Sequence, residues 1–179
     1  MSGAEWLSYS LQDFVMFGPQ VFLRLFVRIN QDLWPWQLLA VVAAIGIPVL
    51  LLRQGDAARR LALGLVAVAW VTSGYGFLVG YFSPINWPAT WFGWAFVAQG
   101  ALLGAALFCG GVHKGRLPVR QFVVLWLVAV CGLPFLAVAD SGQWQSVALF
   151  GIAPGTTAAA GALVIALVTG PWRWLYLPL

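Results

Sequence analysis

The chain has 179 residues, of which 62% are hydrophobic and only 8% are charged, and its net charge is +4. A typical soluble domain carries about 25% charged residues. So few charges cannot cover the surface of a water-soluble fold of this size. We therefore expect the chain to fold in lipid, and we expect neither a soluble catalytic domain nor a nucleic-acid partner.

The apolar stretches predict the secondary structure. Inside lipid every backbone N–H and C=O needs an internal partner, which leaves helices or closed barrels. The stretches run for about 17 to 25 residues, the length of a helix that crosses a ~30 Å hydrocarbon core. They do not alternate between apolar and polar residues as barrel strands do. We predict an all-α, polytopic membrane helix bundle.

Residues 1–35 are more polar and predict an amphipathic helix at the membrane surface. Pro19 suits its first turn and Pro35 marks its end. Two sides of the predicted helix differ in character: Phe22, Leu25, Phe26, Ile29 and Leu33 on one side, and Gln20, Arg24, Arg28 and Gln31 on the other. Two placements remain open. The helix lies in the headgroup plane with its apolar face toward the acyl chains, or it folds back and packs on the bundle.

About five spans follow this segment, at residues 36–52, 61–82, 88–112, 119–139 and 144–169. Pro48 is expected to kink the first span near its far end. Aromatic residues gather near the span ends, where such rings prefer the depth of the headgroups. They are Trp34, Trp36, Tyr81, Trp87, Trp91, Trp144, Trp172 and Trp174.

Basic residues predict the orientation of the bundle. Seven of the nine Lys and Arg residues fall on one side of it. They are Arg53, Arg59 and Arg60 in the first connection, Lys114, Arg116 and Arg120 in the third, and Arg173 after the last span. The positive-inside rule makes that side cytoplasmic. We expect a multi-pass protein of the bacterial cytoplasmic (inner) membrane with its N-terminus outside.

No ionisable residue falls deep in a predicted span, which argues against a pump, a voltage sensor or a proton-coupled transporter. The single histidine, His113, lies in a basic connection and is expected to be solvated. Cys109 is expected to serve packing. Since a metal site or a haem needs several converging ligands, we predict no metal site and no catalytic residue.

Glycines four residues apart let two helices approach closely in a membrane. Gly76 with Gly80, and Gly100 with Gly104, have this spacing in the second and third spans. We predict that these four glycines mediate helix packing, within the fold or against a partner.

Two polar places are candidate cavity residues. Gln99 lies inside the third span, where a buried amide needs a hydrogen-bond partner. The second place is Gly151, Pro154, Gly155, Thr156 and Thr157 in the fifth span. Pro154 and the glycines predict an interrupted helix. The interruption is either a proline kink whose freed carbonyls bind the threonine hydroxyls, or a ligand-binding break of the kind found in transporters.

The sequence resembles a known family through WPWQLL at the first span, SPINW before the third, Gln99 downstream, and LFGIAPGTT in the fifth. Together these motifs resemble an uncharacterised bacterial family of multi-pass membrane proteins, a domain of unknown function. The resemblance extends from about Phe17 to Trp174. The chain departs from the family pattern after Pro154, where Gly155 and Thr156 replace an expected proline and cysteine. The resemblance implies architecture alone, with at least one further span expected after WLYLPL.

Two functions remain open at this stage. The first is a small accessory or structural subunit of a larger membrane complex, in contact with lipids and other membrane subunits. Such a subunit has aromatic surface suited to lipid, quinone or a pigment such as a carotenoid, and the sequence specifies none of these cofactors. The second is a channel or carrier for a neutral or lipophilic solute, built on the broken fifth helix, with Gln99 and Tyr75. A membrane enzyme is disfavoured.

Overall fold

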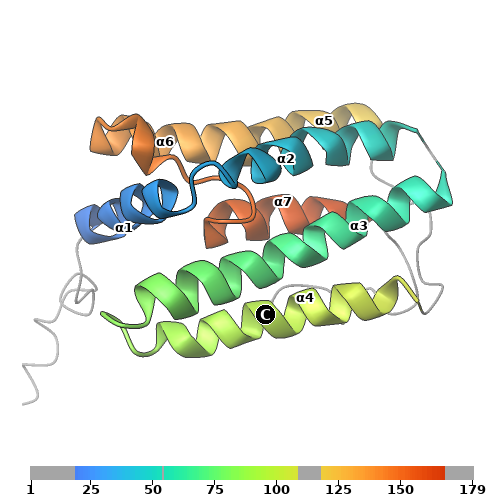
Figure 1. Ribbon diagram of the computed structural model, residues 1–179. Coiled ribbons are helices and arrows are strands. Elements are labelled where there is room, and N and C mark those ends of the chain that lie inside the picture. The colour runs from blue at the N-terminus through green and yellow to red at the C-terminus, as the bar shows by residue number, and fades with distance from the viewer. Residues whose placement is uncertain (1–18, 54, 109–117, 168–179) are drawn as a thin grey trace, which may run out of the picture.

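A computed structural model describes residues 19–53, 55–108 and 118–167 of the chain (Figure 1). The prediction of an all-helical fold is confirmed, because these residues form helices joined by short connections and contain no strand. In chain order the elements are α1 (Pro19–Asp32), α2 (Gln37–Leu52), α3 (Asp56–Val71) continued by the π-helix η2 (Thr72–Phe82), α4 (Ala89–Ala106), α5 (Val119–Leu127) continued by the π-helix η3 (Val128–Gly132) and by α6 (Leu133–Ser141), the 3₁₀ turn η4 (Trp144–Ser146), and α7 (Pro154–Leu167).

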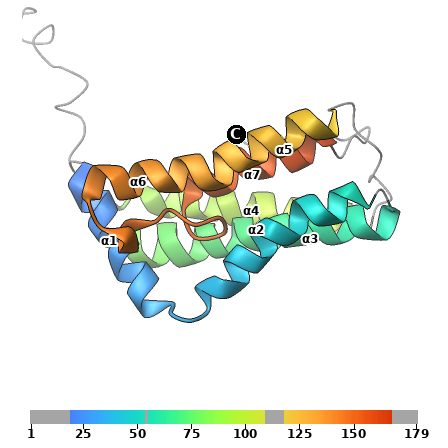
Figure 2. The same cartoon turned by 90° about the horizontal axis from the view of Figure 1, so that it is seen from above.

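The helices run lengthwise in alternating directions, except for α1, which lies across one end of the bundle (Figure 2). The axes of α1 and α2 differ by 101°. The two ends of the bundle carry different side chains. One, here called the arginine end, holds Arg53, Arg59, Arg60 and Arg120, where α2 ends and where α3 and α5 begin. The other, here called the tryptophan end, holds Trp34, Trp36, Trp87, Trp91 and Trp144, which are 65% to 73% exposed.

Two of the described helices are long and apolar enough to cross a membrane, Asp56–Phe82 and Arg120–Ser141. The bent pair Val21–Asp32 and Gln37–Leu52 makes a third if it is taken as one span. The last apolar helix, α7, has 14 residues. At a rise of about 1.5 Å per residue it is ~21 Å long, which is shorter than the ~30 Å hydrocarbon core.

Helix α1 packs its apolar face on the bundle, as in the second of its two expected placements. Leu23, Phe26 and Ile29 are buried. The ring of Phe26 stacks on Phe77 of η2 with centroids 4.8 Å apart. At its C-terminal end, Asp32 accepts a hydrogen bond of 2.8 Å from the Tyr81 hydroxyl. Because η2 and η4 cover the apolar face of α1, this face is not available to the acyl chains.

The connection after α2 is shorter than predicted. Helix α3 begins at Asp56 directly after Gly55, so Arg59 and Arg60 belong to the helix and not to a loop. Asp56 lies in the first turn, where a carboxylate interacts favourably with the helix dipole. It also binds the guanidinium of Arg59 at 2.8 Å. This local pairing allows the helix to begin several residues before the apolar stretch does.

Helices α3–η2 and α4 are in backbone contact at three glycines. A Cβ added at Gly93 would lie 2.9 Å from the carbonyl oxygen of Gly74, and one added at Gly74 would lie 2.7 Å from the carbonyl oxygen of Gly93. At Gly100 it would lie 2.7 Å from the carbonyl oxygen of Ala67. The spacing rule therefore placed Gly100 correctly and missed Gly74 and Gly93.

The other three predicted packing glycines do not mediate contacts between the described helices. A Cβ at Gly76 or Gly104 would meet no atom within 4 Å. At Gly80 it would approach only the carbonyl oxygen of Tyr75 on the same helix, at 3.6 Å. At these positions the described helices make no close contact, and packing against a partner stays a prediction.

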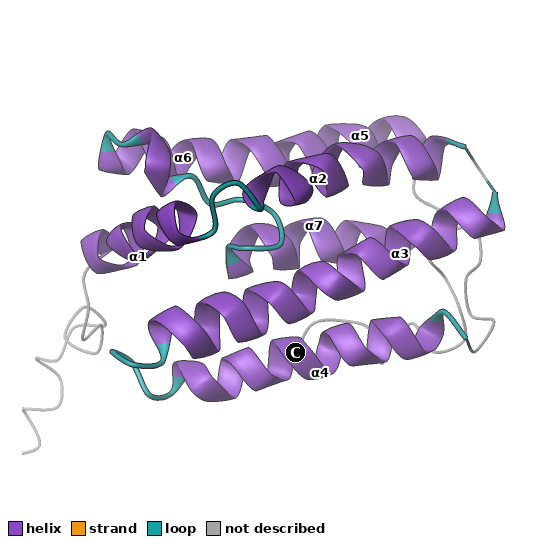
Figure 3. Cartoon of the chain, in the orientation of Figure 1, coloured by secondary structure: helices purple, strands orange, loops and turns teal. Residues whose placement is uncertain are grey.

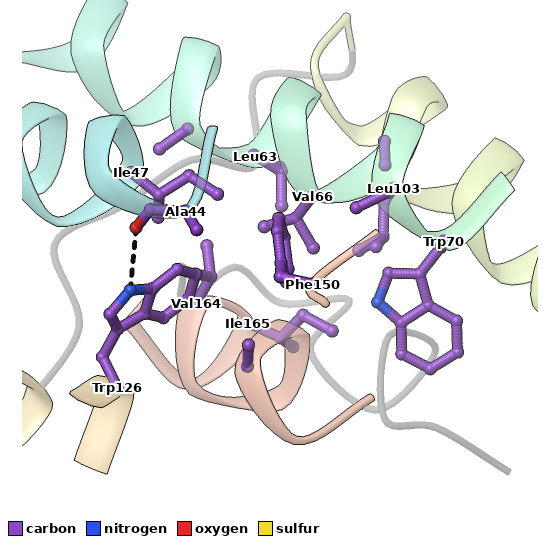
Figure 4. Packing of buried hydrophobic residues seen from close by; sticks show 14 of the residues in the cluster. Ala44, Ile47, Leu63, Val66, Trp70, Leu103, Trp126, Phe150, Val164 and Ile165 are labelled. Atoms are coloured by element: carbon purple, nitrogen blue, oxygen red, sulfur yellow. Dashed lines mark hydrogen bonds between the residues drawn. The ribbon is translucent and has the colours of Figure 1, made fainter. Parts of the chain in front are cut away.

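The core of the bundle joins α2, α3, α4, α5 and α7 through aliphatic and aromatic side chains (Figure 4). The indole N–H of Trp126 on α5 donates to the carbonyl oxygen of Ala44 on α2 at 3.0 Å. The Trp70 ring lies against Phe96 at 4.5 Å between centroids. It also touches α7 so closely that a Cβ at Gly161 would lie 2.3 Å from its Nε1 atom. Large rings and small residues thus fit together between the helices.

Candidate functional site

The most irregular backbone of the described chain lies between α6 and α7. Helix α6 ends at Gly142, which has a left-handed φ of 67°. After the short turn η4, residues 147–153 form no regular helix and pass between the surrounding helices to reach Pro154 (Figure 3). We call residues 143–153 the linking segment. We call the linking segment together with α7 the broken crossing, because the two parts pass through the helix bundle one after the other.

The broken crossing corrects the prediction of a span at residues 144–169 with a kink at Pro154. Pro154 is the first residue of α7 and does not bend a longer helix. This position suits proline, because the N–H that it lacks would have no partner inside the helix. The prediction of an interrupted helix was therefore right about the place, but the residues before Pro154 are not helical.

Residues 146–153 of the linking segment are buried or half-buried, so their backbone polar groups need partners inside the protein. Ser146, Ala148, Phe150, Ile152 and Ala153 are all buried. An unsatisfied carbonyl in such a place would cost about 1–3 kcal/mol. The partners come from side chains on three other helices.

Two hydroxyls at the junction of α3 and η2 bind one part of the segment. Thr72 donates to the carbonyl oxygen of Gly151 at 2.8 Å, and Ser73 donates to that of Ile152 at 3.1 Å. Gly151 has a φ of 81°, a left-handed conformation that glycine adopts without strain. The adjacent Thr–Ser pair thus fixes the point at which the chain turns toward α7.

Helix α1 binds the other part of the segment through Asn30, which is buried. Its Nδ2 amide donates to the carbonyl oxygens of Gln145 at 2.8 Å and Val147 at 2.9 Å. Gln37, at the start of α2, donates in turn to the backbone carbonyl oxygen of Asn30. Asn30 therefore links the helix that lies across the bundle to the segment beneath it.

The two threonines at the start of α7 complete the set of side chains that bind the backbone of the linking segment. Thr156 donates to the carbonyl oxygen of Ala148 at 2.7 Å. Thr157 donates to the carbonyl oxygen of Ala153 at 2.7 Å and accepts from the Gly151 N–H at 2.9 Å. Both hydroxyls are buried and bind backbone groups of their own broken crossing.

The remaining predicted residues are spread over the molecule. Gly155 is exposed and Pro154 is half-buried at the start of α7. Gln99 is buried on α4. Cys109, His113, Lys114, Arg116 and the residues from 168 onward lie outside the described part of the chain.

Asn30, Thr72, Ser73 and Ser146 were not among the predicted site residues. Thr72 and Ser73 could have been predicted, since two adjacent hydroxyl residues in an apolar span need acceptors. Asn30 had no such signal, because a polar residue is ordinary in an amphipathic helix. Within the residues that the structure describes, no group of three or more His, Cys, Asp or Glu side chains is placed to hold a metal ion.

Comparison with known proteins places this architecture in a family. The model of a family of unknown function, DUF6064, matches residues 19–176. The chain belongs to this family. The match includes α1, the whole bundle and the broken crossing, so these elements are parts of one family domain. No curated protein and no solved structure matches the chain.

Proposed function

We propose that this member of the DUF6064 family crosses the bacterial cytoplasmic membrane five times with its N-terminus outside. The five crossings are α2, α3–η2, α4, α5–η3–α6 and the broken crossing. Two observations support this arrangement. Exposed tryptophans gather at one end of the bundle, as in membrane-interface belts, and arginines gather at the other, as on cytoplasmic sides.

Cysteine labelling tests the orientation. With Cys109 and Cys131 replaced by alanine, we expect Gln143→Cys, at the tryptophan end, to react with a membrane-impermeant maleimide on intact cells. Gly55→Cys, at the arginine end, is expected to react only after the membrane is opened, because the bilayer separates it from the reagent. Both positions are exposed. Labelling of Gly55→Cys alone on intact cells would reverse the proposed orientation.

We propose that the chain acts as an accessory or structural subunit of a larger membrane complex. The observation that carries this proposal is the use of the buried polar side chains. Asn30, Ser73, Thr156 and Thr157 bind the protein's own backbone. The outer surface, in contrast, exposes large apolar and aromatic side chains suited to lipid and to other membrane helices.

Native purification tests the subunit proposal. After gentle detergent extraction from its native membrane, we expect the chain to migrate with other membrane proteins in a fixed ratio on native electrophoresis. Mass spectrometry of the band would identify those partners, and an absorption spectrum would detect a bound pigment or quinone. Migration of the chain alone or as a homo-oligomer, without a chromophore, would contradict the proposal.

A second candidate, a channel or carrier for a neutral or lipophilic solute, is favoured by the broken crossing itself. Non-helical backbone at membrane depth is tolerated when it is buried in protein or lines a wet cavity, and transporter sites are often built from such helices. In this chain burial in protein accounts for the non-helical linking segment, because side chains from α1, η2 and α7 bind its carbonyls. Isolation without partners would make this candidate the leading one.

A further inference from the structure

The arginine end carries positive charge that the described residues do not balance. Its four arginines, Arg53, Arg59, Arg60 and Arg120, face one acidic residue, Asp56, which gives 4 − 1 = +3. Asp56 pairs with Arg59, whereas Arg53, Arg60 and Arg120 are exposed. At the tryptophan end, two arginines and two aspartates (Arg24, Arg28, Asp32 and Asp140) give 2 − 2 = 0.

The three exposed arginines come from three helices that pack together. The hydrogen bond from Trp126 to Ala44 joins α5 to α2 inside the core. Arg120 precedes Trp126 by six residues on α5, and Arg53 follows Ala44 by nine residues at the end of α2. At 1.5 Å per residue, Arg120 and Arg53 therefore lie about 9 and 14 Å from this hydrogen bond, both toward the same end of the bundle. Helix α3, which packs on α2, brings Arg60 to this end as well (Figure 1).

Helix stability does not explain the place of Arg120, which is the second residue of α5. A cation near the beginning of a helix is repelled by the positive end of the helix dipole. An anion outside the protein would relieve this repulsion.

We propose that Arg53, Arg60 and Arg120 form a binding surface for the phosphate-bearing headgroups of anionic phospholipids. The neighbouring surface decides between a lipid and free phosphate. Leu52, Leu61 and Val124, close to these arginines in sequence, are exposed by 52%, 55% and 55%. An acyl chain has apolar contacts there that inorganic phosphate lacks, so a lipid makes both kinds of contact at once.

Thermal unfolding of the detergent-solubilised full chain tests the proposal through its tryptophan fluorescence. We expect phosphatidylglycerol to raise the unfolding temperature at lower concentration than phosphatidylcholine does. Each of Arg53→Gln, Arg60→Gln and Arg120→Gln is expected to raise the half-saturating concentration of phosphatidylglycerol about fivefold. The matched control is Arg24→Gln, an exposed arginine at the tryptophan end, which should leave it unchanged.

Three outcomes would overturn the proposal. Equal stabilisation by the two lipids would show that headgroup charge is irrelevant. An equal rise of the half-saturating concentration in Arg24→Gln would show that the effect depends on the net charge of the chain and not on the arginine end. Stabilisation by inorganic phosphate equal to that by phosphatidylglycerol would assign the surface to a free anion. Because the single variants keep Arg59 and its ion pair with Asp56, they leave the start of α3 intact. None of these results depends on whether the chain has protein partners.

Discussion

Replacing Gly93 with alanine is expected to lower the free energy of unfolding by about 1–3 kcal/mol, the range for overpacking of a tightly packed site. The new Cβ would lie 2.5 Å from the Cγ2 atom of Val79 and 2.9 Å from the carbonyl oxygen of Gly74. The valine can rotate, but the carbonyl belongs to the backbone of η2, so the two helices must separate. Thermal unfolding in detergent, followed by tryptophan fluorescence, measures the effect.

Gly104→Ala is the matched control for this prediction. Gly104 lies on the same helix, α4, and a Cβ there would meet no atom within 4 Å. Since alanine is the better helix former by about 1 kcal/mol, we expect this variant to be as stable as the parent or slightly more stable. The glycine-spacing rule predicts the opposite order, with Gly104 sensitive. A larger loss at Gly104 than at Gly93 would show that the α3–α4 contact is wrongly placed.

Replacing Asn30 with alanine is expected to loosen the linking segment. The change removes both donors to the carbonyl oxygens of Gln145 and Val147. Each carbonyl left without a partner costs about 1–3 kcal/mol, to the extent that it stays buried. We therefore expect faster amide hydrogen exchange in residues 147–153, measured by mass spectrometry, with α3 and α4 as protected as in the parent chain.

The neighbouring Gln31 provides the control for this second prediction. Gln31 is an exposed residue of the same helix, α1. Its replacement by alanine changes a side-chain amide to a methyl group but leaves the bonds of Asn30 in place. Equal exchange in the two variants would mean that Asn30 does not hold the linking segment. Faster exchange throughout the bundle would mean that Asn30→Ala disturbs the whole fold, which would contradict a local effect.

The two predictions rest on features that differ in how far the sequence reveals them. Pro154 and Gly151 mark the broken crossing locally, because proline lacks the N–H and glycine adopts a positive φ. The partners of the broken crossing are distant in sequence. Asn30 is 115 residues from Gln145, and Thr72 is 79 residues from Gly151. No local pattern connects such positions. Thr156 and Thr157, which follow Pro154 directly, could therefore be predicted as part of the site, whereas Asn30 could not.

The helical class of this protein and the different side chains at its two ends can be predicted from the amino-acid sequence. These properties follow from composition and from charges and tryptophans near the ends of apolar stretches, which need no knowledge of neighbours. The tertiary structure alone decided where α1 packs, which glycines lie at helix contacts, and that residues 147–153 are not helical. Each of these depends on how a helix is rotated about its axis and on what faces it. Gly100 and Gly104 share one motif, yet only Gly100 meets another helix.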